Sequence, residues 1–232
     1  MAKIHRFIED FDLTKKELEI SGDIAHQIIK VLKLEIGEKV ELCNGKDTVA
    51  LGEIKDIAKK NVIVKIISKK KEDSNSKKVS LFCAVLKKEN FELVVQKATE
   101  IGISKIIPII SARTIKTGLN LERLQKIAKE ASEQSGRISV PEILEPISFE
   151  KSLELCKKDD FNILFDGSGE PLGGLATKWE KINIFIGPEG GWTEEEIEKV
   201  KNKNFKIMNL GNLTLRGETA AIISSYLAVN LK

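Results

Sequence analysis

The chain has 232 residues, of which 38 are Lys or Arg and 35 are Asp or Glu, so its formal net charge is +3. A hydrophobic content of 41% is normal for a globular protein and excludes a chain that is disordered throughout. The length suits one or two domains of roughly 100–200 residues each. No apolar run approaches the roughly 20 residues of a membrane-spanning helix, and the small net charge alone indicates no particular partner.

The first residues and the few Cys and His residues indicate where the protein is located and whether disulfides or metal sites are expected. Residues 1–6 lead into an acidic stretch without the apolar run of a signal peptide, which predicts a cytoplasmic protein without a membrane partner. Cys43, Cys83 and Cys156 lie far apart, so we expect small core residues and not a disulfide framework. Because the chain has two His residues, we expect no His-rich metal site.

Residues 1–72 have the pattern of a small β-rich unit. A strand near 41–43 enters an Asn-Gly turn at 44–45, the strongest short signal for a hairpin, and further strands are predicted at 49–54 and 61–67. One helix is predicted before them, after Ser21, with His26 and Lys30 on one side. Its buried face is indicated by the spacing of Ile24, Ile28, Val31 and Leu32. These elements predict a small barrel with one helix.

The segment 68–78 contains only Ser, Lys, Glu, Asp and Asn. A polar stretch without an apolar residue is typical of a linker. We therefore expect a first domain over 1–72 and a second over 73–232.

From residue 79 onward, short apolar strands alternate with helices. Strands are predicted at 79–84, 106–110, 162–166, 183–187 and 206–210. Helices are predicted over 91–101, ended by Gly102; over 121–131, with Asn120 as N-cap; from Thr193, with Glu196 completing a capping box; and from Glu218 to the C-terminus. This alternation predicts a mostly parallel sheet with helices on both faces.

Two loops follow predicted strands, and ligands in open α/β sheets bind beyond the carboxyl ends of strands. The loop at 187–193 has three Gly and one Pro in its first five residues and opens a helix. It lacks the Lys of a phosphate loop, which disfavours a nucleotide-phosphate enzyme. The loop at 210–216 leads Arg216 and Glu218 into the last helix. The helix dipole favours Glu218 there but not Arg216, so we expect another partner for that guanidinium.

Arginine is rare in this chain, since only five of the 38 basic residues are Arg. They are Arg6, Arg113, Arg123, Arg137 and Arg216. A guanidinium binds phosphate or carboxylate with two parallel hydrogen bonds, which Lys cannot do. Each Arg is therefore a candidate for a specific role, although chance in a Lys-rich composition explains some of them equally well.

Taken together, these motifs resemble the RsmE family of SPOUT methyltransferases. The resemblance is carried by Ile-Gly-Pro-Glu-Gly-Gly at 186–191 and by Leu-Gly-Asn-Leu-Thr-Leu-Arg-Gly-Glu-Thr-Ala at 210–220. Supporting matches lie at 96–102, at 130–137 followed by Pro141, and from His26 to Lys33. The chain departs from the family pattern at Gly217, where Thr is common, at Lys33, where Arg is common, and in the residues flanking Arg113.

The resemblance implies a small PUA-like β-barrel that binds RNA, followed by an α/β SPOUT domain. That domain would have a C-terminal trefoil knot over roughly 162–232, and the protein would be a homodimer. It also implies S-adenosylmethionine as cofactor and methylation of N3 of a uridine in small-subunit (16S) ribosomal RNA, free or in the small ribosomal subunit. Two alternatives stay open: a SPOUT enzyme acting on tRNA or 23S ribosomal RNA, and a non-catalytic RNA-binding assembly protein.

The resemblance also implies the roles of individual residues. The cofactor would contact Leu164, Ile186, Gly187, Pro188, Glu189, Gly190, Leu210, Gly211, Asn212, Leu213, Leu215, Thr219 and Ala220. Because N3 must lose its proton before it attacks a methyl group, Arg216 and Arg113 would stabilise the charge on the uracil, and Glu218 or Glu189 would act as base. Positioning alone supplies much of such a rate, so the base stays open. RNA contacts would come from Arg6, His26, Lys33, Lys97 and Arg137.

Overall fold

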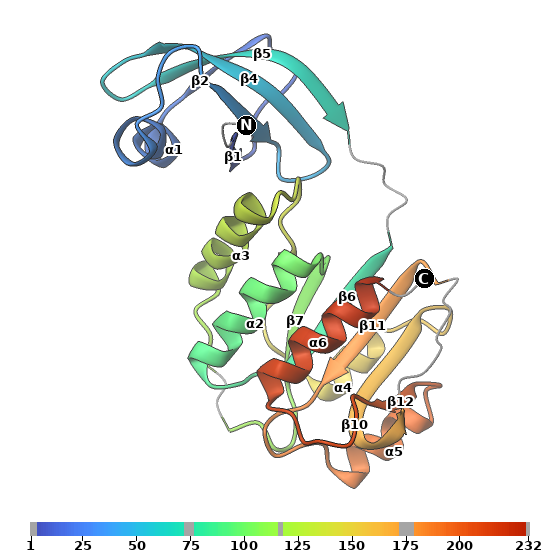
Figure 1. The fold of residues 1–232 in the computed structure, drawn as a ribbon. Helices are drawn as coiled ribbons and strands as arrows, with labels where there is room; N and C mark the ends of the chain where they lie inside the picture. The colour runs from blue at the N-terminus through green and yellow to red at the C-terminus, as the bar shows by residue number, and fades with distance from the viewer. Residues whose placement is uncertain (1–3, 72–76, 116–117, 172–178, 231–232) are drawn as a thin grey trace. The chain divides into compact units, whose positions relative to one another are not determined.

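The protein is described here by a computed structural model covering residues 4–71, 77–115, 118–171 and 179–230 (Figure 1). Its backbone divides into two compact units. The first comprises Met1–Asn75 and Ser132–Val140, and the second comprises Ser76–Ala131 and Pro141–Lys232. In the described part of the chain, no helix is both long enough and apolar enough to span a bilayer.

The first unit contains a five-stranded sheet with the order β1-β3-β4-β5-β2. Its strands are β1 (His5–Ile8), β2 (Glu17–Ile20), β3 (Lys39–Cys43), β4 (Thr48–Ile57) and β5 (Val62–Lys71), and its helices are α1 (Gly22–His26) and the π-helix η1 (Gln27–Leu32). Strands β3, β4 and β5 confirm the sequence prediction. The sequence does not predict β1 and β2, because four residues are too few for a clear alternation of apolar and polar side chains.

The hairpin between β3 and β4 is antiparallel, as the Asn44-Gly45 dipeptide predicts. The side-chain oxygen of Asn44 accepts the backbone N–H groups of Lys46, Asp47 and Thr48, each at 3.0 Å. Gly45 has a φ of 73°, a conformation that glycine adopts without steric cost. The turn is thus closed by one side chain and one glycine.

The linker prediction is wrong at both of its ends. β5 continues through Lys71, with Ser68 paired to Leu51 and Lys71 paired to Thr48 of β4, and Lys78 already belongs to β6. Pairing with a neighbouring strand satisfies the backbone whatever the side chains are, so the polar composition does not prevent a strand here. Residues 72–76 lie outside the described residues.

The predicted helix of the first unit is present but its buried face is narrower than expected. Ile24 and Ile28 are buried, whereas Val31 is 63% exposed. The cause is the π-helical turn of η1, in which each turn takes more residues than in an α-helix, so Val31 rotates away from the core. The helix ends at Lys33, which has a left-handed φ of 53°.

The second unit contains a parallel sheet with the order β12-β10-β11-β6-β7-β8, and β9 also pairs with β7. Its elements are β6 (Lys78–Ala84), α2 (Lys88–Ile101), β7 (Lys105–Ile110), α3 (Leu121–Ser135), β8 (Glu142–Ile143), β9 (Ile147–Ser148), α4 (Phe149–Glu154), β10 (Phe161–Pro171), β11 (Lys181–Ile186), α5 (Glu194–Lys201), β12 (Lys206–Asn209) and α6 (Gly217–Asn230). The end of α3, from Ser132, belongs to the first unit. The predicted strands and helices are all present. The sequence does not predict the short elements β8, β9 and α4.

Helices cover both faces of this sheet, as predicted (Figure 1). On one face, α4 and α5 enclose an aromatic core in which Phe82 and Phe185 stack with their ring centroids 4.3 Å apart. On the other face, α2 and α6 lie side by side, and α6 also lies against β6 and β11. This arrangement leaves the carboxyl ends of the strands as one edge from which the loops emerge.

The predicted helix boundaries are confirmed by their capping contacts. Gly102 ends α2 with a φ of 113°. The side chain of Asn120 accepts the N–H of Arg123 at 3.0 Å and so caps α3. Thr193 and Glu196 form the expected capping box at the start of α5.

Candidate functional site

Three of the loops that leave the carboxyl edge of the parallel sheet carry candidate site residues. They are the β7 loop (111–115), the β11 loop (187–193) and the β12 loop (210–216). Since parallel strands end at a common edge, residues separated by about a hundred positions in sequence meet there. The two loops that the sequence singles out are thus brought to the same edge, on either side of β10.

The β11 loop is built around the indole of Trp192, which is 6% exposed. Its Nε1–H donates to the backbone oxygen of Phe165 in β10 at 3.1 Å. A Cβ atom on Gly187 would lie 3.1 Å from this indole, closer than side chains normally approach. Pro188 is buried, and its oxygen accepts the N–H of Gly191 at 2.8 Å. Gly187 therefore has a packing role, whereas Glu189 and Gly190 are exposed.

Arg113 of the β7 loop is fastened to the β11 loop. Its Nη1 donates to the backbone oxygen of Gly190 at 2.7 Å and to that of Trp192 at 3.1 Å. A Cβ atom on Gly190 would lie 3.3 Å from the Arg113 side chain, so the two loops are in close contact. The guanidinium thus holds the backbone of the neighbouring loop.

Glu196 is a further residue at this junction, and the sequence indicates it only as half of a capping box. Its carboxylate accepts the N–H of Thr193 at 2.8 Å, as a capping box requires, and also the N–H of Ala112 at 2.9 Å. Sequence spacing carries no signal for the second contact, because Ala112 lies 84 positions away.

The β12 loop is anchored at its start and open at its tip. Asn209 donates to the oxygen of Gly169 in β10 at 2.7 Å and accepts the N–H of Gly211 at 3.1 Å. Leu213 at the tip is 82% exposed, and Asn212 is also exposed. Leu210 and Leu215, at the two ends of the loop, are half-buried. The loop therefore offers backbone groups and apolar side chains to a ligand.

The start of α6 brings Glu218 into contact with α2. Glu218 is 9% exposed and accepts a hydrogen bond from the Asn90 side chain at 3.2 Å. A Cβ atom on Gly217 would lie 2.9 Å from the side chain of Leu86, so this turn packs tightly. Arg216 is exposed, and no partner of its guanidinium is present among the described residues. Thr219 and Ala220 follow on α6 and are half-buried.

Leu164 and Ile186 lie on opposite faces of the sheet. Leu164 belongs to the aromatic core beneath α4 and α5, and its partner in β11 is Phe185 of the same core. Ile186 is the next residue of β11 and pairs with Phe165 and Cys83. Because successive side chains of a strand point to opposite faces, Ile186 faces away from the aromatic core. Burial and the nearby charge of Glu189 raise the pKa of the Cys83 thiol, which therefore stays protonated. Leu164 and Ile186 are both predicted cofactor contacts, but of these two only Ile186 lies on the face that carries α6.

The candidate RNA-binding residues have very different surroundings. Arg6 forms an ion pair with Glu41 at 2.6 Å and also donates to the oxygen of Gly136, so it joins β1, β3 and the segment 132–140 within the first unit. Arg137 donates to the oxygen of Ser139 at 3.1 Å. In the second unit, Lys97 pairs with Glu100 at 2.9 Å. His26 and Lys33 are exposed.

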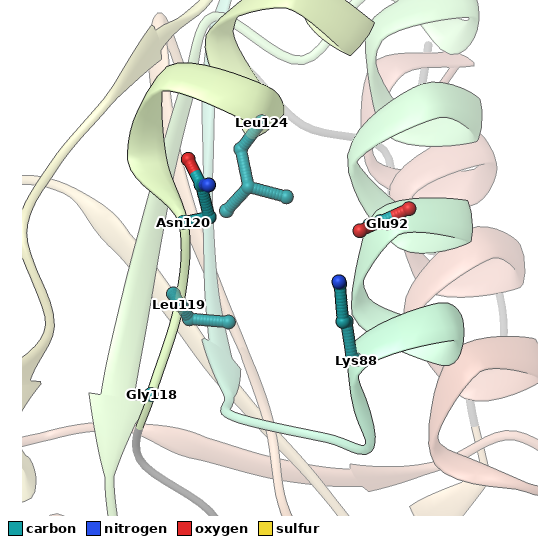
Figure 2. A pocket seen from close by; sticks show the side chains of 6 residues that line it. All are labelled: Lys88, Glu92, Gly118, Leu119, Asn120 and Leu124. Atoms are coloured by element: carbon teal, nitrogen blue, oxygen red, sulfur yellow. The ribbon is translucent and has the colours of Figure 1, made fainter.

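A cavity of about 150 Å³ opens between the first turns of α2 and α3 (Figure 2). It is lined by Lys88, Glu92, Gly118, Leu119, Asn120 and Leu124, none of which the sequence singles out as a ligand-binding residue. Glu92 is held by Arg123 through two hydrogen bonds of 2.6 and 2.8 Å, and this contact lowers the pKa of Glu92. Across the described ranges, no group of three or more His, Cys, Asp and Glu side chains is arranged to hold a metal ion.

Two family models match separate parts of the chain. Residues 73–228 match the model of an RNA methyltransferase domain, and residues 20–67 match that of an RNA methyltransferase PUA domain. The ribosomal RNA small subunit methyltransferase E of Rickettsia conorii is 34% identical, over 89% of this chain and 86% of the relative.

Two solved structures show the same fold over nearly the whole chain. A ribosomal RNA small subunit methyltransferase E from Neisseria gonorrhoeae, bound to S-adenosyl methionine, has a TM-score of 0.88 and 26% identity, with 96% of this chain and 95% of that chain covered. A methyltransferase from Legionella pneumophila, in complex with the same cofactor, has a TM-score of 0.84 and 28% identity, with 98% and 97% covered. This chain, with its PUA domain followed by a parallel-sheet methyltransferase domain, belongs to the RsmE family of small-subunit ribosomal RNA methyltransferases.

Proposed function

We propose that this protein methylates N3 of a uridine in small-subunit (16S) ribosomal RNA, with S-adenosylmethionine as methyl donor. The observation that carries the proposal is the meeting of the β11 loop, the β12 loop and the start of α6 at one edge of the sheet, with an exposed Arg216 beside a buried Glu218. The names of the Rickettsia and Neisseria relatives and the cofactor in two solved relatives support it.

The residues at this edge suit an adenosine-containing cofactor. Leu210 and Leu215 offer apolar surface for an adenine ring, and Ile186 is buried at the end of β11 just before the loop. Glycines 190 and 211 are exposed, which leaves the Gly190 N–H and the Gly211 oxygen accessible, since the Gly190 oxygen accepts from Arg113 and the Gly211 N–H donates to Asn209. Pro188, Glu189, Asn212, Leu213, Thr219 and Ala220 complete the set of proposed contacts. Leu164 is enclosed in the aromatic core, so we propose that it supports the site from behind. When bound, the cofactor supplies an electrophilic methyl group on its sulfonium.

Arg216 is our candidate for charge stabilisation during the transfer. N3 of uridine carries a proton at neutral pH, and its loss leaves negative charge on the two uracil oxygens. A free guanidinium stabilises such charge with directed hydrogen bonds. Arg113 is already engaged with the oxygens of Gly190 and Trp192, so we propose for it the positioning of the β11 loop.

Two carboxylates are candidates to receive the N3 proton. Glu218 is buried and held by Asn90 next to Arg216, whereas Glu189 is exposed in the β11 loop. Glu218 is the better candidate, because its position is fixed by a hydrogen bond, and fixed geometry lowers the entropic cost of proton transfer. In the balanced reaction, the N3–CH3 bond forms as the sulfur–CH3 bond breaks, and the N3 proton passes to the carboxylate.

We propose that the first domain, 1–72, binds the RNA around the target uridine, and that 73–232 with a C-terminal knot carries the chemistry. Exposed lysines of the first unit include Lys33 and the three lysines at 69–71, which end β5, and the His26 imidazole is also exposed. Arg6 and Arg137 have internal partners, which favours a structural contribution for both. Because ribosomal RNA is the proposed substrate, we place the protein in the cytoplasm.

We also propose that a second copy of the chain covers α6. This helix has one charged side chain, Glu218, in its 14 residues, yet Ile223 and Tyr226 are exposed on it, the latter to 59%. Leu93 is exposed on the adjacent α2. A helix that is apolar on all sides is normally buried, so this face fits a subunit interface.

Mapping the modified base tests the proposal. The protein is incubated with labelled cofactor and either small ribosomal subunits or naked 16S ribosomal RNA, and the labelled nucleotide is identified. We expect 3-methyluridine at a single position. Label found only in tRNA or 23S ribosomal RNA would replace the proposed target by one of the alternatives. Absence of cofactor binding in calorimetry, with and without RNA, would instead indicate a non-catalytic RNA-binding protein.

A further inference from the structure

Glu196 is a buried carboxylate with three hydrogen-bond donors around it. It is 3% exposed, and one of its oxygens accepts from the backbone N–H of Thr193 at 2.8 Å and from the Thr193 hydroxyl at 3.3 Å. The other oxygen accepts the backbone N–H of Ala112 at 2.9 Å. Burying a carboxylate is unfavourable unless such partners satisfy it, so this side chain is fixed in its position.

The contact with Ala112 is not needed for the helix cap. A capping box uses one carboxylate oxygen and contacts within four residues, and the Thr193 contacts complete it. The second oxygen instead reaches the β7 loop. In the opposite direction, Arg113 of the β7 loop reaches the oxygens of Gly190 and Trp192 in the β11 loop. The first turn of α5 therefore holds the β7 loop through Glu196, and the β7 loop holds the β11 loop through Arg113.

We propose that Glu196 is a positioning residue of the cofactor site, which fixes the β7 loop against the β11 loop and so sets the backbone geometry around Gly190. This inference rests on the proposed function, because it takes the β11 loop as a wall of the cofactor site. Glu196 itself touches no substrate in this arrangement. Its effect passes through Ala112, Arg113 and the backbone of the β11 loop.

Replacement by Gln separates this role from simple helix capping. Glu196→Gln keeps the shape of the side chain but turns one acceptor into an NH₂ donor, so either Ala112 N–H or Thr193 N–H faces another donor. Thr193→Ala removes the hydroxyl of the cap and leaves the Glu196–Ala112 contact in place. Glu195→Gln is the matched control, because Glu195 is exposed on the neighbouring position of α5.

The first measurement is calorimetric affinity for S-adenosylmethionine, taken well below the thermal midpoint of each variant. We expect the Kd of Glu196→Gln to rise about 10-fold, as for loss of a charge-assisted hydrogen bond. The Kd of Glu195→Gln should stay within about twofold of the unmodified protein. Thr193→Ala keeps the Glu196–Ala112 contact, so its Kd should rise less than that of Glu196→Gln. If Glu196→Gln lowers the thermal midpoint as Thr193→Ala does but leaves the Kd unchanged, Glu196 is a helix cap only and the inference is wrong.

The second measurement needs no cofactor, so it separates this inference from the proposed function. Amide hydrogen exchange should accelerate in both the β7 and β11 loops of Glu196→Gln, but only in the first turn of α5 in Thr193→Ala. Faster exchange in α5 alone would overturn the inference even if the protein binds no cofactor at all. If Glu196→Gln does not fold, Glu196→Asp replaces it, because the shorter carboxylate reaches Thr193 or Ala112 but not both.

Discussion

Gly187→Ala tests whether the indole of Trp192 sets the geometry of the β11 loop. The new methyl group would lie 3.1 Å from two atoms of the indole and 3.3 Å from a third. The indole cannot simply rotate away, since it is 6% exposed, donates to the oxygen of Phe165 and contacts the ring of Phe149. The indole or the loop must therefore shift by a few tenths of an ångström.

The structure gives the approximate size of this effect. Overpacking of a filled core costs about 1–3 kcal/mol, and a weakened Trp192–Phe165 hydrogen bond adds about 1 kcal/mol. The two terms together amount to about 2–4 kcal/mol. At roughly 2–4 °C per kcal/mol for a chain of this size, the thermal midpoint should fall by about 4–16 °C. Because the oxygen of Trp192 accepts from Arg113, the same shift should weaken cofactor binding.

Thermal unfolding followed by tryptophan fluorescence measures the loss of stability, and calorimetry with S-adenosylmethionine measures the loss of cofactor affinity. Gly118→Ala is the matched control, because a Cβ atom there has no neighbour within 4 Å and its φ is not in the left-handed region. We expect Gly118→Ala to be neutral or slightly stabilising. If Gly187→Ala behaves like Gly118→Ala in both assays, the packing argument for Gly187 is refuted.

Three further predictions concern other parts of the molecule. Arg216→Lys should leave the cofactor Kd within several-fold and lower turnover about 100-fold in the labelling assay; near-normal turnover would remove Arg216 from the mechanism. Hydrogen bonds, first from Lys71, lower the pKa of Asp47 to about 2, so the carboxylate stabilises the fold above its unfolded pKa near 4. The stability difference between the protein and Asp47→Asn should therefore disappear in thermal melts as the pH falls from 4 to 2, and a pH-independent difference would contradict this. Tyr226→Lys should yield monomers in sedimentation, whereas Leu155→Lys, at another exposed apolar position, should not; an unchanged dimer in both would exclude the α6 interface.

The amino-acid sequence by itself determines the elements that carry the site. A helix such as α2 can be predicted from apolar positions that recur over ten or more residues. Local caps such as Asn120 and Gly102 can be predicted too, because their hydrogen-bond partners lie within a few residues. The loops at 187–193 and 210–216 are readable for the same reason, since their glycines and the strands before them are adjacent in the chain. Two- to six-residue elements such as β8, β9 and α4 carry too short a pattern.

Only the tertiary structure decides how the side chains at the site are used. The sequence marks Arg113 as a candidate for charge stabilisation, but its partners are backbone oxygens 77 and 79 positions away. Leu164 follows the apolar pattern of a strand, but the pairing register decides that it faces the aromatic core and that Ile186 faces α6. The sequence contains a signal for the capping contact between Glu196 and Thr193, but it contains none for the contact between Glu196 and Ala112. Contacts within one turn depend on spacing along the chain, whereas contacts between loops depend on the order of strands in the sheet, which composition and periodicity do not contain.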